Sequence, residues 1–493
     1  MSLPSRATFK SSRYNFVVPV ASGLLLYNSA SGAVLSLHGA DANYLAAQVS
    51  GVPRSVPREA LDSCLLDKLL EGGFVVEDET DEVATIRERF HNAVAGSPIV
   101  LTITTTMDCN LGCYYCYEER SGDRLDVAET QQVVSLAQRL LVDSGKDSLH
   151  VDWYGGEPLL NVAFLESASQ ALQSLCAQRK VFYSASVISN GTLWPVEVLQ
   201  FVRRNKIRQV QISFDGMGAN HNKRRKYRKG YLDDEKPSSF DEAVRLVDEL
   251  VRHVRVDLRL NVDRGNQDDV LPFMRFARDR GWFSARNRVV FQPARVSSYT
   301  EHSAFMRKVE LTIEEYEEIR AQVRGEAEKS VRVEEAEVPD KFPYPRTSVC
   351  AALARDSIVL GADAKLYRCG LQVGESSRSV GALKMQGSTL LPIFGEGLRG
   401  PSSDETWWRN FDPTALPTCS RCSFLPVCWG GCPKKHLEGD RHALLEQGAY
   451  WRRNLPRLVA EGVGLTCDED FRFVEADQFR DVDLSAPLPQ QEI

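Results

Sequence analysis

A chain of 493 residues is longer than one ordinary domain, and its 43% hydrophobic residues predict sizeable buried cores. The formal net charge of −7 gives no general attraction to nucleic acid, and no stretch approaches the roughly 20 apolar residues of a membrane-spanning helix. The polar segment 1–13 has no apolar run typical of a signal peptide. We therefore expect a cytoplasmic protein without nucleic-acid or membrane partners.

The first 95 residues contain short strand patterns followed by helical patterns. The strand patterns cover 14–20, 23–27 and 32–37, with Ser and Gly turns between them. Helical patterns follow at 41–49 and 57–71, then an apolar triplet at 74–76 and a charged helix over 79–94. Three strands and several helices in so short a segment predict a small winged-helix-like domain over 1–95.

Strands and helices alternate regularly over 96–300. The predicted strands are 99–104, 148–153, 182–189, 209–214, 257–262 and 289–292, and the predicted helices are 128–144, 162–178, 195–205 and 240–254. Such alternation is typical of parallel strands joined by crossover helices, and six units predict an α/β fold with a partial (β/α)6 barrel. Reactive groups on such a barrel lie at the carboxyl ends of the strands. A helical, charged connector is expected over 301–348.

Twelve cysteines in a chain expected in a reducing compartment indicate metal ligands or catalytic groups rather than disulfides. Three of them lie at 109–116, and seven lie between 350 and 467. Cys64 and Cys176 stand apart in helical patterns, where buried inert thiols are expected.

Cys109, Cys113 and Cys116 form a C-x3-C-x2-C motif directly after the first predicted barrel strand. Three thiolates on one loop can hold three irons of a four-iron cluster and leave the fourth iron open to a small molecule. A zinc site is the alternative, but zinc normally takes four ligands, and the nearest histidine is His91. The spacing favours an iron–sulfur cluster.

The cysteine loop and the strand ends that follow it resemble radical S-adenosylmethionine (radical SAM) enzymes over residues 99–293. In that family the residue before the third cysteine approaches the adenine, a GGEP motif holds the methionine amino group, and later strand ends approach the carboxylate and ribose. The resemblance implies SAM contacts at Tyr115, Gly155, Gly156, Glu157, Asn190, Ser213 and Asp215. It adds Arg225 through an H-x3-R motif that begins at His221, although a surface arginine is an equal alternative.

The later cysteines resemble the seven-cysteine SPASM domain, expected here over 349–475 with a fraying tail at 476–493. Its ligands are Cys350, Cys369, Cys419, Cys422, Cys428, Cys432 and Cys467. The resemblance implies two auxiliary [4Fe-4S] clusters: an outer one held by Cys419, Cys422, Cys428 and Cys467, and an inner one held by Cys350, Cys369 and Cys432. Ala364 stands where the SPASM pattern has a glycine. A zinc ribbon is the alternative fold.

The inner cluster has three cysteine ligands by this count, with Asp356 as the nearest oxygen ligand. The missing fourth ligand implies an open site where a substrate thiolate could bind. A structure with four protein side chains on that cluster would exclude this hypothesis.

These resemblances predict an enzyme that matures a ribosomally made precursor peptide with SAM and three [4Fe-4S] clusters. The N-terminal domain would bind the leader by strand addition, and a flavodoxin or ferredoxin would donate electrons. A Cys-derived thioether or another crosslink is the preferred product, whereas epimerisation and carbon–carbon crosslinking stay open. A formylglycine-forming sulfatase maturase is less favoured, because Gly370 stands where that group has Asp. A zinc-bound peptide-binding scaffold is the alternative without catalysis.

Overall fold

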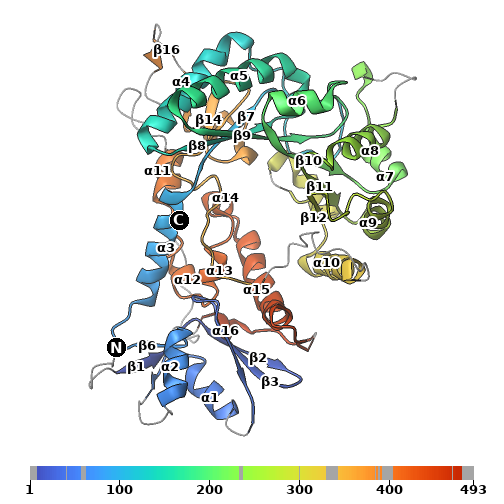
Figure 1. Ribbon diagram of the computed structural model, residues 1–493. Coiled ribbons are helices and arrows are strands. Elements are labelled where there is room, and N and C mark those ends of the chain that lie inside the picture. The colour runs from blue at the N-terminus through green and yellow to red at the C-terminus, as the bar shows by residue number, and fades with distance from the viewer. Residues whose placement is uncertain are drawn as a thin grey trace. The chain divides into compact units, whose positions relative to one another are not determined.

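The chain folds into two compact units that do not follow the order of the sequence (Figure 1). The computed structural model describes residues 8–39, 42–56, 63–231, 237–298, 300–328, 342–383, 385–386, 389–390, 403–468 and 470–479. One unit, the barrel unit, comprises 97–339 and 350–409. The other, the terminal unit, comprises 1–96, 340–349 and 410–493. Each unit is described separately.

The barrel unit is built on a nine-stranded mixed sheet with the order β12-β11-β10-β9-β8-β7-β13-β14-β15. Six strands run parallel in sequence order: β7 (Ile99–Thr104), β8 (Ser148–Tyr154), β9 (Phe182–Ser189), β10 (Ile207–Phe214), β11 (Arg255–Val262) and β12 (Val289–Arg295). The predicted six parallel strands of an α/β fold are therefore confirmed.

Helices lie along the outside of these strands. They are α4 (Thr130–Ser144), α5 (Val162–Arg179), α6 (Val198–Arg204), α7 (Gly218–Arg224), α8 (Ser239–Leu250), α9 (Val270–Asp279), α10 (Ile313–Glu328) and α11 (Ser403–Asn410). Figure 1 shows α4 and α5 stacked beside β7, β8 and β9. Their apolar stripes are buried, as with Leu136 and Leu140 on α4 and Leu165 and Leu172 on α5. This arrangement leaves the two ends of the strands for loops.

Three short strands extend the sheet beyond β7. The first, β13 (Ile358–Leu360), pairs parallel with β7, and β14 (Lys365–Tyr367) and β15 (Gly381–Ala382) continue antiparallel. A further hairpin pairs β16 (Met385–Gln386) with β17 (Thr389–Leu390). All three residues of β13 are buried, so this segment completes the barrel core. The segment expected to form one C-terminal domain over 349–475 is thus shared between the two units.

The terminal unit joins the two ends of the chain. It contains two three-stranded antiparallel sheets with the orders β5-β1-β6 and β2-β3-β4. The strands are β1 (Phe9–Ser11), β2 (Asn15–Val20), β3 (Gly23–Asn28), β4 (Val34–Leu37), β5 (Ser55–Val56) and β6 (Val75–Glu77). The helices are α1 (Ala42–Val49), α2 (Ser63–Glu71), α3 (Glu82–Gly96), α12 (Pro417–Ser420), α13 (Leu425–Cys428), α14 (Pro433–Leu437), α15 (Arg441–Gly462) and α16 (Glu475–Gln478). Residues 57–62 of the predicted helix 57–71 lie outside the described residues.

One hydrophobic cluster connects the N-terminal sheet to the C-terminal helices. Phe16 of β2 stacks on Phe424 with ring centroids 4.9 Å apart, and Phe473 packs on Phe16 at the same distance. Ser29 donates a hydrogen bond to the carbonyl oxygen of Ser423 over 2.7 Å. The segment 1–95 therefore shares its core with residues from 410 onward.

Part of the tail expected to fray over 476–493 is packed. Phe479 is only 6% exposed and belongs to the same cluster, and Gln478 at the end of α16 is also buried. Residues 480–493 of the predicted tail lie outside the described residues. Among the described helices, none combines the length and apolar character that a membrane crossing requires.

Candidate functional site

The carboxyl ends of β8 to β12 surround a cavity of about 460 Å³ in the barrel unit. Its lining contains the three cysteines of the first motif together with Tyr115, Gly155, Gly156, Asn190, Ser213 and Arg225. Nine of the residues proposed from the sequence thus line one cavity, although they come from loops up to about a hundred residues apart. Two further candidates, Glu157 and Asp215, lie behind this wall and are fully buried.

The cysteine loop leaves its three thiols at one edge of this cavity. Cys109 is buried, whereas Cys113 and Cys116 are half-buried. Within the described part of the chain, no three His, Cys, Asp or Glu side chains converge as ligands of a single metal ion. A four-iron cluster does not require such convergence, because each thiolate binds a different iron. The donor set fits a cluster of that kind.

Burial controls the protonation of these thiols in the metal-free chain. It raises the pKa of Cys109 to about 12 and that of Cys116 to about 11. Both cysteines are therefore neutral at physiological pH until a cation replaces the proton.

Gly155 and Gly156 hold the end of β8 against the cysteine loop. A Cβ on Gly155, whose φ is +141°, would lie 2.5 Å from the carbonyl oxygen of Thr106, and one on Gly156 would clash with the carbonyl oxygen of Asp108. The Gly156 N–H donates to Thr106 and the Glu157 N–H to Asp108, each over 3.0 Å. The glycines are thus required by the fold itself, apart from any contact with a ligand.

Glu157 joins the ends of two strands. Its carboxylate accepts hydrogen bonds from the backbone N–H of Asn190 over 2.7 Å and from the Ser189 hydroxyl over 3.0 Å. Burial raises the pKa of Glu157 to about 7, although these donors and Leu159 N–H oppose the shift. The sequence predicted that this carboxylate holds the methionine amino group. In the structure it accepts hydrogen bonds from Ser189 and Asn190.

Asp215 anchors the aromatic residue of the cysteine loop. The Tyr115 hydroxyl donates to Asp215 over 2.7 Å and accepts hydrogen bonds from Arg225 over 2.6 Å and from Asn261 over 3.2 Å. Arg225 is 6% exposed, so the alternative of a surface arginine is wrong. The guanidinium thus lies between the tyrosine, the carboxylate and the cavity.

A second buried network was missed by the sequence analysis. Arg224 forms a bidentate pair with Asp263, with both distances 2.9 Å, and its Nε donates to Asp215 over 2.9 Å. The Tyr114 hydroxyl donates to Asp263 over 2.6 Å. Although burial by itself raises the pKa of Asp263, the hydrogen bonds from Arg224 and Tyr114 hold that pKa below its usual value. The signal was available, because Asp263 directly follows a predicted strand.

Asn190 and its neighbours connect β9 to the cysteine loop. The Asn190 amide donates to Asn110 over 2.8 Å and to the Cys109 sulfur over 3.7 Å. Asn110 in turn donates to Thr192 over 2.8 Å. The conformation of Cys109 is therefore coupled to the end of β9.

Five further residues that line the cavity were also missed by the sequence analysis. They are Tyr117, Glu118, Tyr154, Arg259 and Arg295. The phenols of Tyr117 and Tyr154 are hydrogen-bonded to each other. Burial raises the pKa of Glu118 to about 7, opposed by a hydrogen bond with Tyr154 and by Arg120. These residues add polar groups of both signs to the lining of the cavity.

The second cysteine group is divided between the units. Cys419, Cys422, Cys428, Cys432 and Cys467 belong to the terminal unit, and Cys350 and Cys369 to the barrel unit. The Gln478 amide donates to the Cys422 sulfur over 3.5 Å, and burial, with the neighbouring Cys428, raises the pKa of Cys422 to about 12. Cys419 and Cys428 are half-buried, and burial raises their pKa values as well. Like Cys109 and Cys116, these three thiols have pKa values raised by burial.

Asp356, the oxygen ligand suggested from the sequence, already has a cationic partner. Its carboxylate accepts a hydrogen bond from the Lys146 ammonium over 2.7 Å. The pairing of the carboxylate with Lys146 argues against a role for Asp356 on the inner cluster.

Comparison with known proteins identifies the class of this domain. Residues 103–277 match the profile of the radical SAM superfamily. The matched segment contains the cysteine loop and the strands β8 to β11. The resemblance found in the motifs is thereby confirmed, and the chain carries the domain of an enzyme superfamily.

Three curated relatives show similarity to parts of the chain. A probable GTP 3′,8-cyclase of Methanocella arvoryzae (strain DSM 22066 / NBRC 105507 / MRE50) is 35% identical over 24% of this chain and 34% of its own length. The sporulation killing factor maturation protein SkfB of Bacillus subtilis (strain 168) is 26% identical over 38% and 42%. The antilisterial bacteriocin subtilosin biosynthesis protein AlbA of the same strain is 25% identical over 45% and 48%. The chain thus spans between about a third and a half of these relatives.

A solved structure resembles this chain in fold over a longer part of its length than the relatives above. Native anSMEcpe with bound AdoMet superposes with a TM-score of 0.54 at 17% identity, covering 74% of this chain and 99% of that protein. At this identity the match shows a shared fold.

Proposed function

We propose that the protein is a radical SAM enzyme that modifies a ribosomally made precursor peptide. The observation that carries the proposal is the assembly of the cysteine loop, the Gly155-Gly156 backbone and Arg225 around one cavity within the matched radical SAM domain. When bound, a [4Fe-4S] cluster and SAM supply a 5′-deoxyadenosyl radical that takes a hydrogen atom from the substrate.

The residues of the chain have distinct roles in this proposal. Cys109, Cys113 and Cys116 hold the cluster and leave one iron for SAM. The buried hydroxyl of Tyr115 is fixed by Asp215 and Arg225, which keeps the loop backbone beside the cavity. Ser213 and Asn190 offer polar groups at the strand ends.

Two curated relatives support a peptide as the substrate, because their names describe maturation of a killing factor and biosynthesis of a bacteriocin. The Cys-rich C-terminal segment supports two auxiliary clusters, with Cys419, Cys422, Cys428 and Cys467 on the outer one. The inner cluster would use Cys350, Cys369 and Cys432 and would leave one iron for a substrate thiolate. A thioether remains the preferred product for this reason, with other crosslinks and epimerisation as alternatives.

The N-terminal sheet is the proposed binding site of the leader peptide. Among the described strands, β4 pairs only with β3, so its other edge is available for strand addition. A flavodoxin or ferredoxin is the proposed electron donor.

The test is anaerobic reconstitution with iron, sulfide and SAM, followed by incubation with a reductant and a cysteine-bearing precursor peptide encoded near the gene. We expect about twelve irons and as many sulfides per chain, from three four-iron clusters. We also expect release of 5′-deoxyadenosine and a peptide lighter by two hydrogen atoms. Zinc without sulfide would exclude the proposal, and a peptide of unchanged mass with altered stereochemistry would identify an epimerase.

The matched variant is Cys109→Ala/Cys113→Ala/Cys116→Ala. It should retain about eight irons and lose 5′-deoxyadenosine production completely, because only the auxiliary clusters remain. Retention of all twelve irons would show that these cysteines are not ligands.

A further inference from the structure

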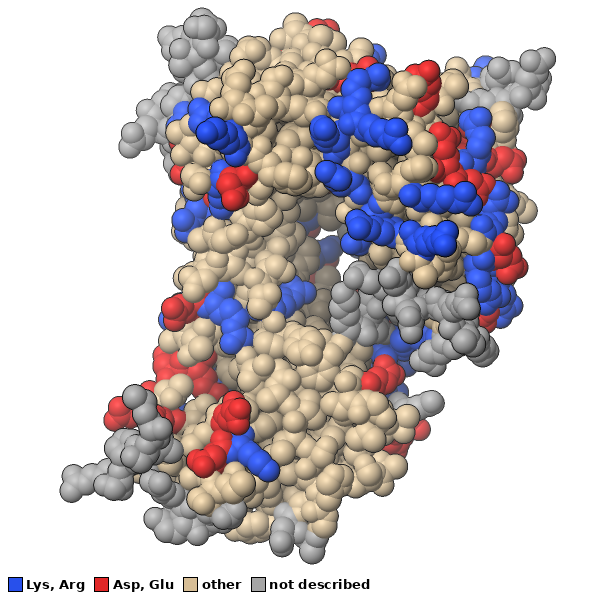
Figure 2. Space-filling view, in the orientation of Figure 1, with Lys and Arg blue, Asp and Glu red and all other residues tan. Residues whose placement is uncertain are grey.

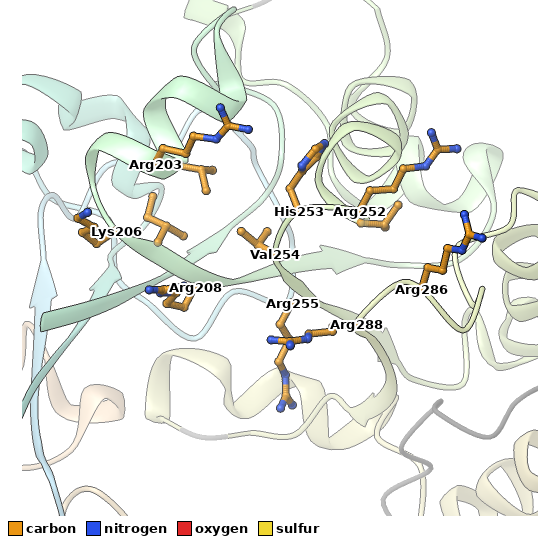
Figure 3. A pocket seen from close by; sticks show the side chains of 12 residues that line it. Arg203, Lys206, Arg208, Arg252, His253, Val254, Arg255, Arg286 and Arg288 are labelled. Carbon is orange, nitrogen blue, oxygen red and sulfur yellow. The ribbon is translucent and has the colours of Figure 1, made fainter. Parts of the chain in front are cut away.

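A second cavity lies at the amino ends of the barrel strands, away from the cysteine loop. It has a volume of about 540 Å³ and is lined by residues that precede or begin β10, β11 and β12 (Figure 3). The cysteine cavity lies at the carboxyl ends of the same strands. Because β10 has eight residues, the strand alone separates the two ends by about 25 Å.

The lining of this cavity is strongly cationic. Seven of its twelve residues are Arg or Lys, and none of the twelve is acidic: they include Arg203, Lys206, Arg208, Arg252, Arg255, Arg286 and Arg288. Figure 2 shows many Lys and Arg side chains on the barrel unit, with Asp and Glu side chains among them toward one edge. The concentration is notable in a chain whose net charge is −7.

Most of these cations lack a carboxylate partner among the described residues. Arg255 pairs with Asp257 over 2.8 Å. The other six form no ion pair with the described residues, and their side chains are exposed. Like charges around one concave surface repel each other and raise the local positive potential, which an anionic ligand would relieve. An ordinary solvated surface intersperses both signs instead.

The floor of the cavity is aliphatic. Val202, Ile207 and Val251 are at most 5% exposed, and Val254 is half-buried. Figure 3 shows Val254 near the centre, with Arg208, His253 and Arg288 around it. A ligand that fits both parts has a flat apolar group and several negative charges. Guanidinium groups suit phosphates in particular, because their planar N–H donors can bind two oxygens at once.

Lys206 lines the cavity with a φ of +53°, in the left-handed region that glycine adopts at lower cost. The volume also lies within the range of about 300–1,000 Å³ typical of small-molecule sites.

We propose that this cavity binds a nucleoside polyphosphate, with its base on the aliphatic floor and its phosphates on the arginines. Since the cavity is at the opposite end of the strands from the thiols, the ligand acts as an effector rather than a reactant. The proposal does not depend on the identity of the peptide substrate.

The test uses full-length, reconstituted protein with saturating SAM, so that the adenosine site at the cysteine loop is already filled. ATP is titrated by calorimetry at low salt, with inorganic phosphate and a ten-residue glutamate peptide as competing probes. The test variant is Lys206→Gln/Arg208→Gln. The matched control is Arg179→Gln/Lys180→Gln, which removes the same charges from exposed residues outside the cavity; Lys180 also has a positive φ, of +57°.

We expect one ATP per chain, an affinity about tenfold lower in the test variant, and a change below about twofold in the control. Unchanged SAM binding in both variants checks their folding. The proposal is overturned if ATP does not bind, or if both variants lose affinity equally. It also fails if inorganic phosphate competes as well as ATP, or if the glutamate peptide binds more tightly than ATP through the same residues.

Discussion

At the scale of single residues, the tight contact between the end of β8 and the cysteine loop is the most sensitive feature of the site. Gly156→Ala would place a methyl group against the carbonyl oxygen of Asp108. We expect a loss of about 1–3 kcal/mol in the free energy of unfolding and a weakening of SAM binding by tenfold or more. Calorimetry of the reconstituted protein measures both.

Gly122→Ala is the matched control for this substitution, because a Cβ at Gly122 meets nothing within 4 Å. Its free energy of unfolding should stay within about 0.5 kcal/mol of the parent. Equal SAM affinity in the parent and in Gly156→Ala would contradict the steric argument.

The buried Glu157 predicts a dependence of stability on pH. Its pKa in the folded chain is about 7, above the value of about 4.3 for an unfolded glutamate. Between these values the folded chain keeps a proton that the unfolded chain has lost. The contribution of Glu157 to the free energy of unfolding is therefore fully present below pH ~4.3. It decreases as the pH rises and is lost above pH ~7, a change of the order of 3 kcal/mol.

Urea unfolding at several pH values, together with infrared detection of the protonated carboxyl group, tests this prediction. Glu157→Gln should flatten the curve and remove the infrared band. Glu118 also has a pKa of about 7, and therefore Glu118→Gln is the necessary comparison. If only the latter variant flattens the curve, the effect belongs to Glu118.

The residues of the site were predictable where a motif fixes them in sequence. Tyr115, Asn190 and Arg225 follow from short motifs, and the structure places all three on one cavity. Arg224 and Asp263 were not found, because their pairing depends on a contact between residues 39 apart. The hydrogen bonds of Glu157 with Ser189 and Asn190 could not be predicted from the sequence either, because they depend on how closely two strand ends approach each other.

At the scale of elements, the long barrel strands were predicted because apolar and polar residues alternate along them, as in β8 and β11, where the apolar residues are the buried ones. The short strands β1, β5 and β13 have two or three residues, too few for a periodic pattern. Their pairing is fixed by tertiary contacts, such as the register between Leu360 of β13 and Ile103 of β7.

The proposal that the leader peptide binds at the edge of β4 can be tested by removing one backbone N–H from this strand. The Asn28 N–H donates to Ala33, and hydrogen-bonded pairs alternate along antiparallel strands. The N–H of Ser36 therefore points away from β3. Ser36→Pro removes this donor and leaves the β3–β4 ladder intact, so leader affinity should fall by about fivefold or more, as for loss of one hydrogen bond.

Ser36→Ala keeps the N–H and should bind the leader as the parent does. Fluorescence anisotropy with a labelled leader peptide measures both variants, and far-ultraviolet circular dichroism checks the sheet. Unchanged affinity in Ser36→Pro would exclude strand addition at this edge.

At the scale of the whole molecule, the shared core of the terminal unit predicts that an N-terminal fragment cannot fold alone. A fragment of residues 1–96 would lack Phe424 and Phe473, which pack on Phe16. We expect it to unfold without a cooperative transition and to be cleaved rapidly by proteases. A cooperative, protease-resistant fragment would indicate an independent domain instead.

In the full-length chain, Phe424→Ala should destabilise the terminal unit by about 3–5 kcal/mol, since a fully buried aromatic ring is removed. The barrel unit has its own core, and SAM binding should persist at low temperature. Denaturant unfolding followed by SAM binding distinguishes the two units.

The alternation of the chain between the units has a consequence for its synthesis on the ribosome. The chain passes from one unit to the other at about residues 97, 340, 350 and 410. The aromatic rings of β2 and β3 emerge first, but their packing partners are translated more than three hundred residues later. At ~5–20 residues per second, those rings stay without their partners for about 20–80 s while the barrel unit is translated. We therefore expect nascent chains to need a chaperone at this stage, and slow refolding of the terminal unit to limit the yield of active protein.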